Sequence, residues 1–213
     1  PVSIAAGRSL SGAITVSAGS LKLNETGTLA STIAMSGGTL DADESLAVSG
    51  ALTQTADITI DVADNKTLTY SGAAIGVGAN TMTLSGGGTL GNTNAILLNN
   101  ANSKLLLNSI TLDNASTSAD SLGLDVDANS TVTSLSVANI TPVAIASGSS
   151  LSGGITVSAG SVKLTEAGTL ASTIAMGSGT LEAGVNLTVS GLISVAGNSA
   201  VSIPAAGTTL TYT

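Results

Sequence analysis

Residues Ser9 to Gly50 read SLSGAITVSAGSLKLNETGTLASTIAMSGGTLDADESLAVSG, and residues Ser150 to Gly191 read SLSGGITVSAGSVKLTEAGTLASTIAMGSGTLEAGVNLTVSG. The two stretches agree at 31 of 42 positions without a gap, at an offset of 141 residues. The match returns near the end of the chain, where residues 67–70 and 209–212 both read TLTY. A long unit has therefore been duplicated, and such internal repeats are typical of solenoids and other repeat architectures.

Inside the unit, short apolar pairs separated by one polar residue recur, as at Ile14 with Val16 and Leu21 with Leu23. This period of two predicts strands, and Gly, Ser and Asn between the pairs predict turns. A helix is not indicated, because glycine interrupts every window with helical apolar spacing. Strands this short and close are typical of coils in a parallel β-helix. The fold class is predicted to be all-β, a parallel β-helix (β-solenoid) of roughly ten short coils.

The composition agrees with a narrow solenoid. The chain is 43% hydrophobic but only 1% aromatic and 8% charged, and it contains no Phe, Trp, Cys or His. A core without large rings must be filled by thin stacks of aliphatic side chains, so we expect leucines and valines of successive coils to lie in columns. The leucines within residues 92–114, at 97–98 and 105–107, are predicted to form strands buried on both faces.

The domain organisation follows from the repeat. Residues 1–213 are predicted to form a single continuous solenoid, with a first copy at 7–147 and a partial second copy at 148–213. At about 20 residues a coil, the unit would hold roughly seven coils, and at about 4.8 Å a coil it would advance by about 34 Å. Since the repeat stops within a copy, we expect the chain to be a segment of a longer array.

Several function classes are disfavoured by what is missing. Without His or Cys, the chain cannot build a Ser-His-Asp or Cys-His arrangement, nor a usual zinc or haem site. The formal net charge of −8 disfavours nucleic acid as a partner. No apolar run approaches the ~18 residues of a membrane span. We therefore expect no enzymatic activity, no catalytic or cofactor-binding residues, no cofactor, and no membrane span in this segment.

Carboxylates are the remaining candidates for chemistry. Asp41, Asp43 and Glu44 lie close together in the sequence and are candidate ligands for Ca²⁺. In the second copy, Gly184 and Val185 stand where Asp43 and Glu44 stand in the first. A site needed in every copy would keep its acids, so the favoured interpretation is solvated turn residues.

A Thr-x-Thr pattern is the other candidate. Two threonines spaced by two on a strand point to the same face, and stacked over successive coils they would form a flat array of hydroxyls and methyls. The pattern occurs four times, at residues 67 and 69, 81 and 83, 131 and 133, and 209 and 211. Because the spacing is irregular, ordinary solvent-facing threonine is the favoured interpretation, and ice binding is an alternative.

Three short sequence segments resemble segments of known proteins. Residues 187–191 read LTVSG, residues 68–72 read LTYSG and residues 82–90 read MTLSGGGTL. They resemble the strand repeats of autotransporter passengers and of filamentous-haemagglutinin-type bacterial adhesins. The resemblance implies a right-handed parallel β-helix, export to the cell surface, and a role in adhesion, matrix or sheath.

These observations lead to one expected function and two alternatives. The chain is expected to be a structural or adhesive segment of a long, repetitive bacterial surface protein, extracellular or at the cell surface. Its expected partners are further copies, by end-to-end or lateral self-association into filaments or a sheath, and cell-surface or glycan contacts. The alternatives are a polysaccharide-binding or polysaccharide-acting β-helix and an ice-binding β-solenoid. Sugar-acting sites use arginine and aromatic platforms, yet Arg8 is the only arginine and Tyr70 and Tyr212 are the only rings.

Overall fold

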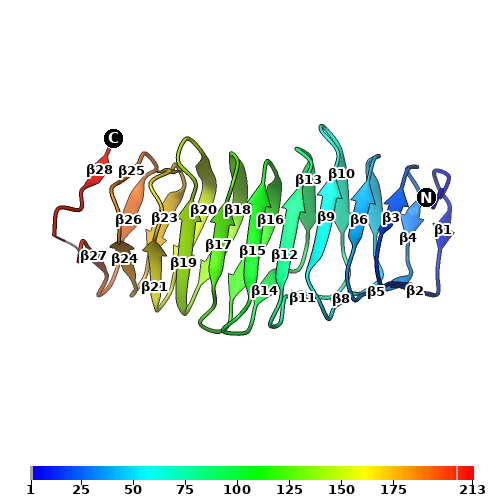
Figure 1. Ribbon diagram of the computed structural model, residues 1–213, viewed down its shortest axis with the longest axis horizontal. Coiled ribbons are helices and arrows are strands. Elements are labelled where there is room, and N and C mark those ends of the chain that lie inside the picture. The colour runs from blue at the N-terminus through cyan, green and yellow to red at the C-terminus, as the bar shows by residue number, and fades with distance from the viewer. Residues whose placement is uncertain (1, 205) are drawn as a thin grey trace.

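The computed structural model describes residues 2–204 and 206–213, and within them it shows 28 short strands and no helix. Figure 1 shows the strands side by side along one long rod, with the N-terminus and the C-terminus at opposite ends. The predicted all-β solenoid is confirmed. No helix in the described residues is long and apolar enough to cross a membrane.

The rod has three walls, which we call face 1, face 2 and face 3 in the order in which the chain visits them. Face 1 contains β1 (Ser9–Leu10), β4 (Thr28–Leu29), β7 (Leu46–Val48), β10 (Thr67–Tyr70), β13 (Thr89–Asn92), β16 (Thr111–Thr117), β18 (Ser130–Val137), β20 (Ser150–Val157), β22 (Thr169–Leu170), β25 (Leu187–Val189) and β28 (Leu210–Tyr212).

Face 2 contains β2 (Ala13–Val16), β5 (Thr32–Met35), β8 (Leu52–Gln54), β11 (Ile75–Gly76), β14 (Ile96–Leu98), β23 (Thr173–Met176) and β26 (Ile193–Val195). In three central coils β16, β18 and β20 are long enough to serve both walls, since their second halves pair with face 2 strands. Face 3 contains β3 (Ser20–Leu23), β6 (Thr39–Ala42), β9 (Ile58–Val62), β12 (Thr81–Ser85), β15 (Lys104–Asn108), β17 (Gly123–Val126), β19 (Ile140–Ile145), β21 (Ser161–Leu164), β24 (Thr180–Ala183) and β27 (Ala200–Ser202).

Every strand pair in the described structure is parallel and joins neighbouring coils. Paired residues lie 19 positions apart at Leu10 and Leu29, and 22 apart at Leu68 and Leu90. The expected coil of about 20 residues is thus confirmed. From β1 to β20, which begin the two copies of the repeat, the face 1 sheet counts seven steps. The estimate of seven coils per unit agrees with this strand order.

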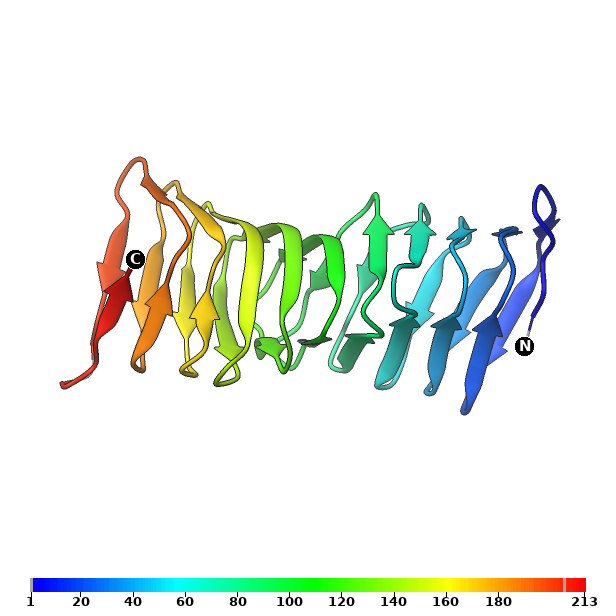
Figure 2. The ribbon, with the colours of Figure 1, turned by 90° about the horizontal axis from the view of Figure 1, so that it is seen from above.

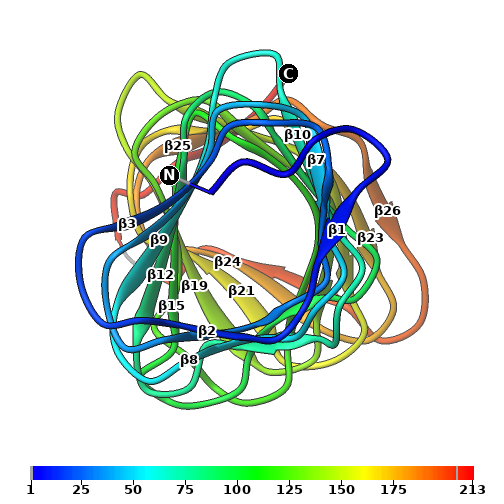
Figure 3. The same ribbon diagram turned by 90° about the vertical axis from the view of Figure 1, so that its right-hand side faces the viewer.

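The winding is right-handed. Figure 3 looks along the rod from its N-terminal end, and the chain passes clockwise from β1 to β2 to β3 as it moves away from the viewer. Figure 2 shows the same coils from above, each displaced along the axis from the one before. This hand is the one favoured wherever a chain crosses between parallel strands of one sheet.

The core consists of columns of side chains that run along the axis. One column on face 3 joins seven coils through directly paired, buried residues: Leu21, Leu40, Ile60, Leu84, Leu107, Val126 and Ile145. On face 1, the five paired residues Leu46, Leu68, Leu90, Leu112 and Val132 do the same. The predicted stacking of aliphatic side chains is confirmed, and burying each apolar side chain contributes about 1.5–3 kcal/mol before entropy opposes it.

The leucine-rich segment was predicted wrongly in one respect. Leu98, Leu105 and Leu107 are buried, but Leu97 and Leu106 point outward and are only half-buried. A solenoid wall is a single sheet whose residues alternate between core and exterior. A run of consecutive leucines on such a strand therefore cannot be buried on both sides.

Tight corners between face 1 and face 2 require glycine at matching positions of the two copies. A Cβ atom on Gly50 would overlap the backbone carbonyl of Ser31 in the coil below, and one on Gly191 would overlap that of Ser172. Ser31 and Ser172 are themselves buried, and each donates a hydrogen bond from Oγ to a carbonyl of the preceding coil. These corners hold successive coils at the close spacing that the columns need.

Candidate functional site

The exterior differs in chemistry from face to face, and face 3 carries most of the charge found on strands. Its outward residues include Lys22, Lys104 and Lys163. Each lysine forms an ion pair with a carboxylate of the next coil, at Asp41, Asp125 and Glu182 respectively. Since each pair joins successive coils, these contacts connect neighbouring turns of the rod.

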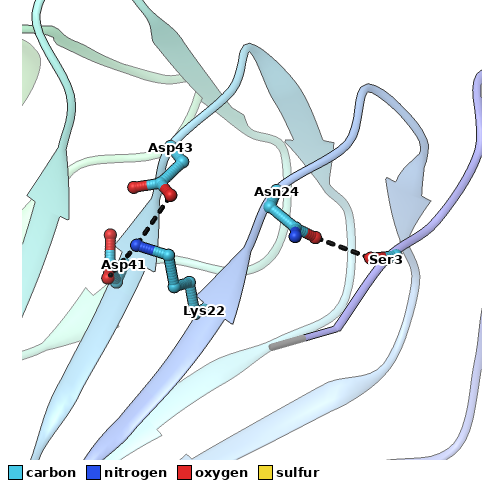
Figure 4. A network of polar contacts seen from close by, with 5 residues as sticks. All are labelled: Ser3, Lys22, Asn24, Asp41 and Asp43. Atoms are coloured by element: carbon cyan, nitrogen blue, oxygen red, sulfur yellow. Dashed lines mark hydrogen bonds and ion pairs between the residues drawn. The ribbon is translucent and has the colours of Figure 1, made fainter.

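Of the three Ca²⁺ candidates, Asp41 lies on β6, and Asp43 and Glu44 lie where face 3 turns toward face 1. Figure 4 shows Lys22 between two of them. Its Nζ lies 3.3 Å from an Asp41 oxygen and 2.6 Å from an Asp43 oxygen. The hydrogen bond from Lys22 holds the pKa of Asp43 below its ordinary value, and Asp43 in turn raises the pKa of Lys22. Glu44 faces elsewhere and pairs with Lys66 at 2.6 Å.

This arrangement brings two of the candidate acids together around an ammonium group. A lysine already occupies the position between the carboxylates where a cation would have to sit, and no cluster of three or more His, Cys, Asp or Glu suited to a metal occurs in the described residues. Lys163 and Glu182 repeat the first pair in the second copy at 3.1 Å. The geometry favours the interpretation of these acids as residues of turns and of ion pairs between coils.

Other acids of the sequence serve as local acceptors. The Oδ1 atom of Asp57 accepts a hydrogen bond from the backbone N–H of Thr81, one coil further on, at 2.8 Å. Asp61 accepts one from the hydroxyl of Ser85, with which it is paired in register. Both contacts join successive coils, which is a structural use of a carboxylate.

Face 1 carries a row of hydroxyl side chains on successive coils, which the sequence analysis did not identify. Thr67, Thr89, Thr111 and Thr131 are paired in order on four successive coils, and Ser152 follows on the next. Thr131 and Ser152 are linked by a hydrogen bond of 2.7 Å between their hydroxyl groups. We call these five residues the hydroxyl ladder. All five are half-buried, because each is flanked by its neighbours in the column.

The Thr-x-Thr pairs do not make one surface. Thr67 and Thr131 belong to the hydroxyl ladder on face 1, but residues 81 and 83 lie on β12, a strand of face 3. The second member of the first pair, Thr69, is followed in its column by Gly91. The signal that could have found the ladder is a Thr followed by Leu or Val, recurring every 20 or 22 residues from Thr67.

Neither tyrosine provides a built sugar platform. Tyr70 is buried, its hydroxyl accepts a hydrogen bond from Leu52 N–H at 3.0 Å and donates one to the Ala73 carbonyl at 2.8 Å, and burial raises its pKa. Tyr212 is exposed at the last strand. A groove of about 350 Å³ beside β25 and β28 is lined by small and hydroxyl residues, among them Thr169, Thr188 and Thr211, and contains no titratable side chain.

Face 2 differs from the other two walls in carrying no charge on its strands. Within the described structure, every strand residue of face 2 is uncharged. Its outward side chains are mostly small, such as Thr15, Ala34 and Thr53 in the first three coils. The molecule therefore presents a charged wall, a wall with a hydroxyl ladder, and a neutral wall.

Comparison with known proteins returns no relative. No known protein family, no curated protein and no solved structure matches this chain.

Proposed function

We propose that this chain is a structural or adhesive segment of an extracellular fibre, belonging to a long, repetitive bacterial surface protein. The observation that carries the proposal is the fit between the repeat and the coils. The 141-residue unit corresponds to seven steps of the face 1 sheet, and the second copy begins on the eighth strand, β20. Duplicating such a unit lengthens the rod without creating a cleft or a new constellation of reactive groups.

The chemistry of the exterior supports the same proposal. Lysines are paired across coils with acids, and the remaining exterior consists mainly of Ser, Thr, Ala and Gly. Such a surface suits repeated weak contacts along a length more than a single concave site, because ligand pockets generally combine an apolar lining with a few convergent polar groups.

Surface labelling of intact cells tests this proposal. Antibodies raised against the 213-residue chain are expected to label intact cells of the source organism, and brief protease treatment of those cells is expected to remove the signal. A cytoplasmic protein of the same cells, stained before and after permeabilisation, is the control. Labelling that appears only after permeabilisation would contradict an extracellular role.

The hydroxyl ladder supports ice binding as a second candidate function. One threonine per coil at a spacing of about 4.8 Å provides a regular row of methyls and hydroxyls from Thr67 to Thr131. A purified chain that binds ice through this row is expected to show thermal hysteresis, and Thr89→Lys with Thr111→Lys should abolish it. Thr59→Lys on face 3 is the matched control, and hysteresis unchanged by the face 1 pair would exclude the ladder.

A further inference from the structure

We infer that face 2 is a lateral docking surface for a second copy of this chain, so that rods associate side by side through their neutral walls. The inference deepens the proposed function, since it names the partner of a fibre segment. It rests on three properties of face 2: the lack of charge on its strands, the small size of most of its outward side chains, and the absence of charge there in both copies of the repeat.

The distribution of charge favours face 2 as the contact surface between two copies. Two copies with a net charge of −8 each repel one another. Contact through face 3 would bring Asp41, Asp61 and Glu182 of one copy against the same wall of the other, or would require breaking the lysine pairs. On face 1, Asp113 lies within β16. Contact through the strands of face 2 removes none of their residues' charges from water, because those residues are uncharged.

Size and shape then allow close approach. On face 2 the outward column runs through Thr15, Ala34 and Thr53, and later through Leu97, Ser116, Ser136, Thr156 and Ala175, with one residue per coil. Leu97 is the one large side chain among these residues. Sheets pack face to face at about 10 Å, and identical small side chains at a constant repeat can interdigitate. Because both partners have the same repeat along the axis, a match at one coil extends to the next.

The two copies of the repeat retain this surface. Thr15, Thr32 and Ala34 correspond to Thr156, Thr173 and Ala175, all identical. Ala13 becomes Gly154, and on the third strand of this wall Thr53 becomes Ser194 and Gln54 becomes Val195. At the corner between face 3 and face 1, by contrast, residues 43–45 read DES in the first copy and GVN in the second. Every change on face 2 replaces one uncharged residue by another, while the corner loses two carboxylates.

The available area predicts a weak contact at this length. Ten coils line face 2, and a strip three to four residues wide covers about 500 Å² on each partner. The total of about 1,000 Å² lies at the lower end of specific interfaces. Association should thus appear in the micromolar to millimolar range for this chain and strengthen with each added coil.

The salt dependence separates this contact from one made by ion pairs. Salt screens the repulsion between two negatively charged rods but leaves a neutral interface unchanged. The weight-average mass of the purified chain in analytical ultracentrifugation is expected to rise with protein concentration and to rise further with added NaCl. A decrease with NaCl would point to face 3 and would overturn the inference.

Matched charge variants test the wall itself. Thr15→Glu with Thr156→Glu places two carboxylates on face 2, and Ser20→Glu with Ser161→Glu places two on face 3 at corresponding positions of the same coils. Juxtaposed like charges in a contact are costly, so the face 2 pair should weaken association by about tenfold or more, and the face 3 pair by about twofold or less. Circular dichroism verifies that both remain folded. Equal effects of the two pairs, or a wild-type chain that stays monomeric at every concentration, would overturn the inference.

Single introduced cysteines test directly which walls of two copies lie close together, because the chain has no cysteine of its own. Ala34→Cys on face 2 should form a disulfide-linked dimer under mild oxidation at high protein concentration, and Ser20→Cys on face 3 should do so at least about tenfold more slowly. Faster crosslinking of Ser20→Cys would contradict the inference. Failure of this contact leaves the result of surface labelling untouched, so the two proposals fail separately.

Discussion

The first two coils with the strand that follows them, residues 9–50, and their duplicate, residues 150–191, share most of their sequence but differ in a patterned way. Inside the rod only Leu21 changes, to Val162, and both are buried in the same column position. At the corner between face 3 and face 1, Asp43 and Glu44 become Gly184 and Val185. The comparison teaches that burial in the core columns restricts substitution far more than a place at an exposed corner does, even where the corner residue forms an ion pair with another coil.

The largest effect is expected at the corner glycines that both copies retain. Gly50→Ala and Gly191→Ala should each destabilise the rod by at least about 4 kcal/mol, because the new methyl group overlaps a backbone carbonyl that cannot move aside like a side chain. Urea unfolding followed by circular dichroism measures the loss. Gly177→Ala, where the added Cβ would come no closer than 3.5 Å to its nearest neighbour and φ is not positive, is the matched control. Similar losses at Gly177 and Gly50 would argue against the close approach.

Shortening a side chain in the face 3 column should lower the free energy of unfolding by nearly the same amount in either copy of the repeat. Leu40→Ala and Leu181→Ala each remove a buried side chain from the same column position, and each is expected to cost about 3 kcal/mol. Thermal unfolding of the two variants checks the prediction. A loss under about 1 kcal/mol for both would mean that the aliphatic columns do not hold the rod together.

Tyrosine offers a sharper contrast, since Tyr70 and Tyr212 occupy corresponding strands in different surroundings. Tyr70→Phe leaves the N–H of Leu52 and the carbonyl of Ala73 without their buried partner and should cost about 1–3 kcal/mol. Tyr212→Phe should be nearly neutral, because its ring is exposed. Chemical denaturation of both variants tests the difference, and equal costs would contradict it.

The smallest effect concerns pH and the acid that the second copy lacks. Lys22 lowers the pKa of Asp43, so the stability contributed by Asp43 is present above its unfolded pKa, near 3.8, and is lost as pH falls through the lower folded value. Lys22 has a raised pKa, so its contribution is present below about 10.5 and is lost as pH rises through the folded value. In Asp43→Asn, the melting temperature should fall slightly less steeply at acid pH than it does in the wild-type chain. No change should follow from Glu25→Gln, because that carboxylate is exposed.

Much of the architecture could be read from residues such as Ile14 and Val16, because a period of two and glycine-bounded turns are local properties. The outward orientation of Leu97 and Leu106 could not be predicted in this way, since it depends on whether a second layer covers the strand. The carboxylates of Asp41 and Asp43 were identified as neighbours in sequence, but their common partner Lys22 comes from the preceding coil.

By itself the amino-acid sequence determined the strands, the coil of about 20 residues, the duplication and the aliphatic core, because hydrophobic periodicity and repetition do not depend on distant contacts. Only the tertiary structure decided which outward residues share a wall. Paired residues of successive coils are 19 to 24 positions apart, so regular spacing in the sequence does not show that Thr67 and Thr131 belong to one ladder while Thr83 lies on another face. The same stacking gathered the charges on face 3 and left face 2 neutral, because register between coils, and not distance along the chain, sets which side chains stand together.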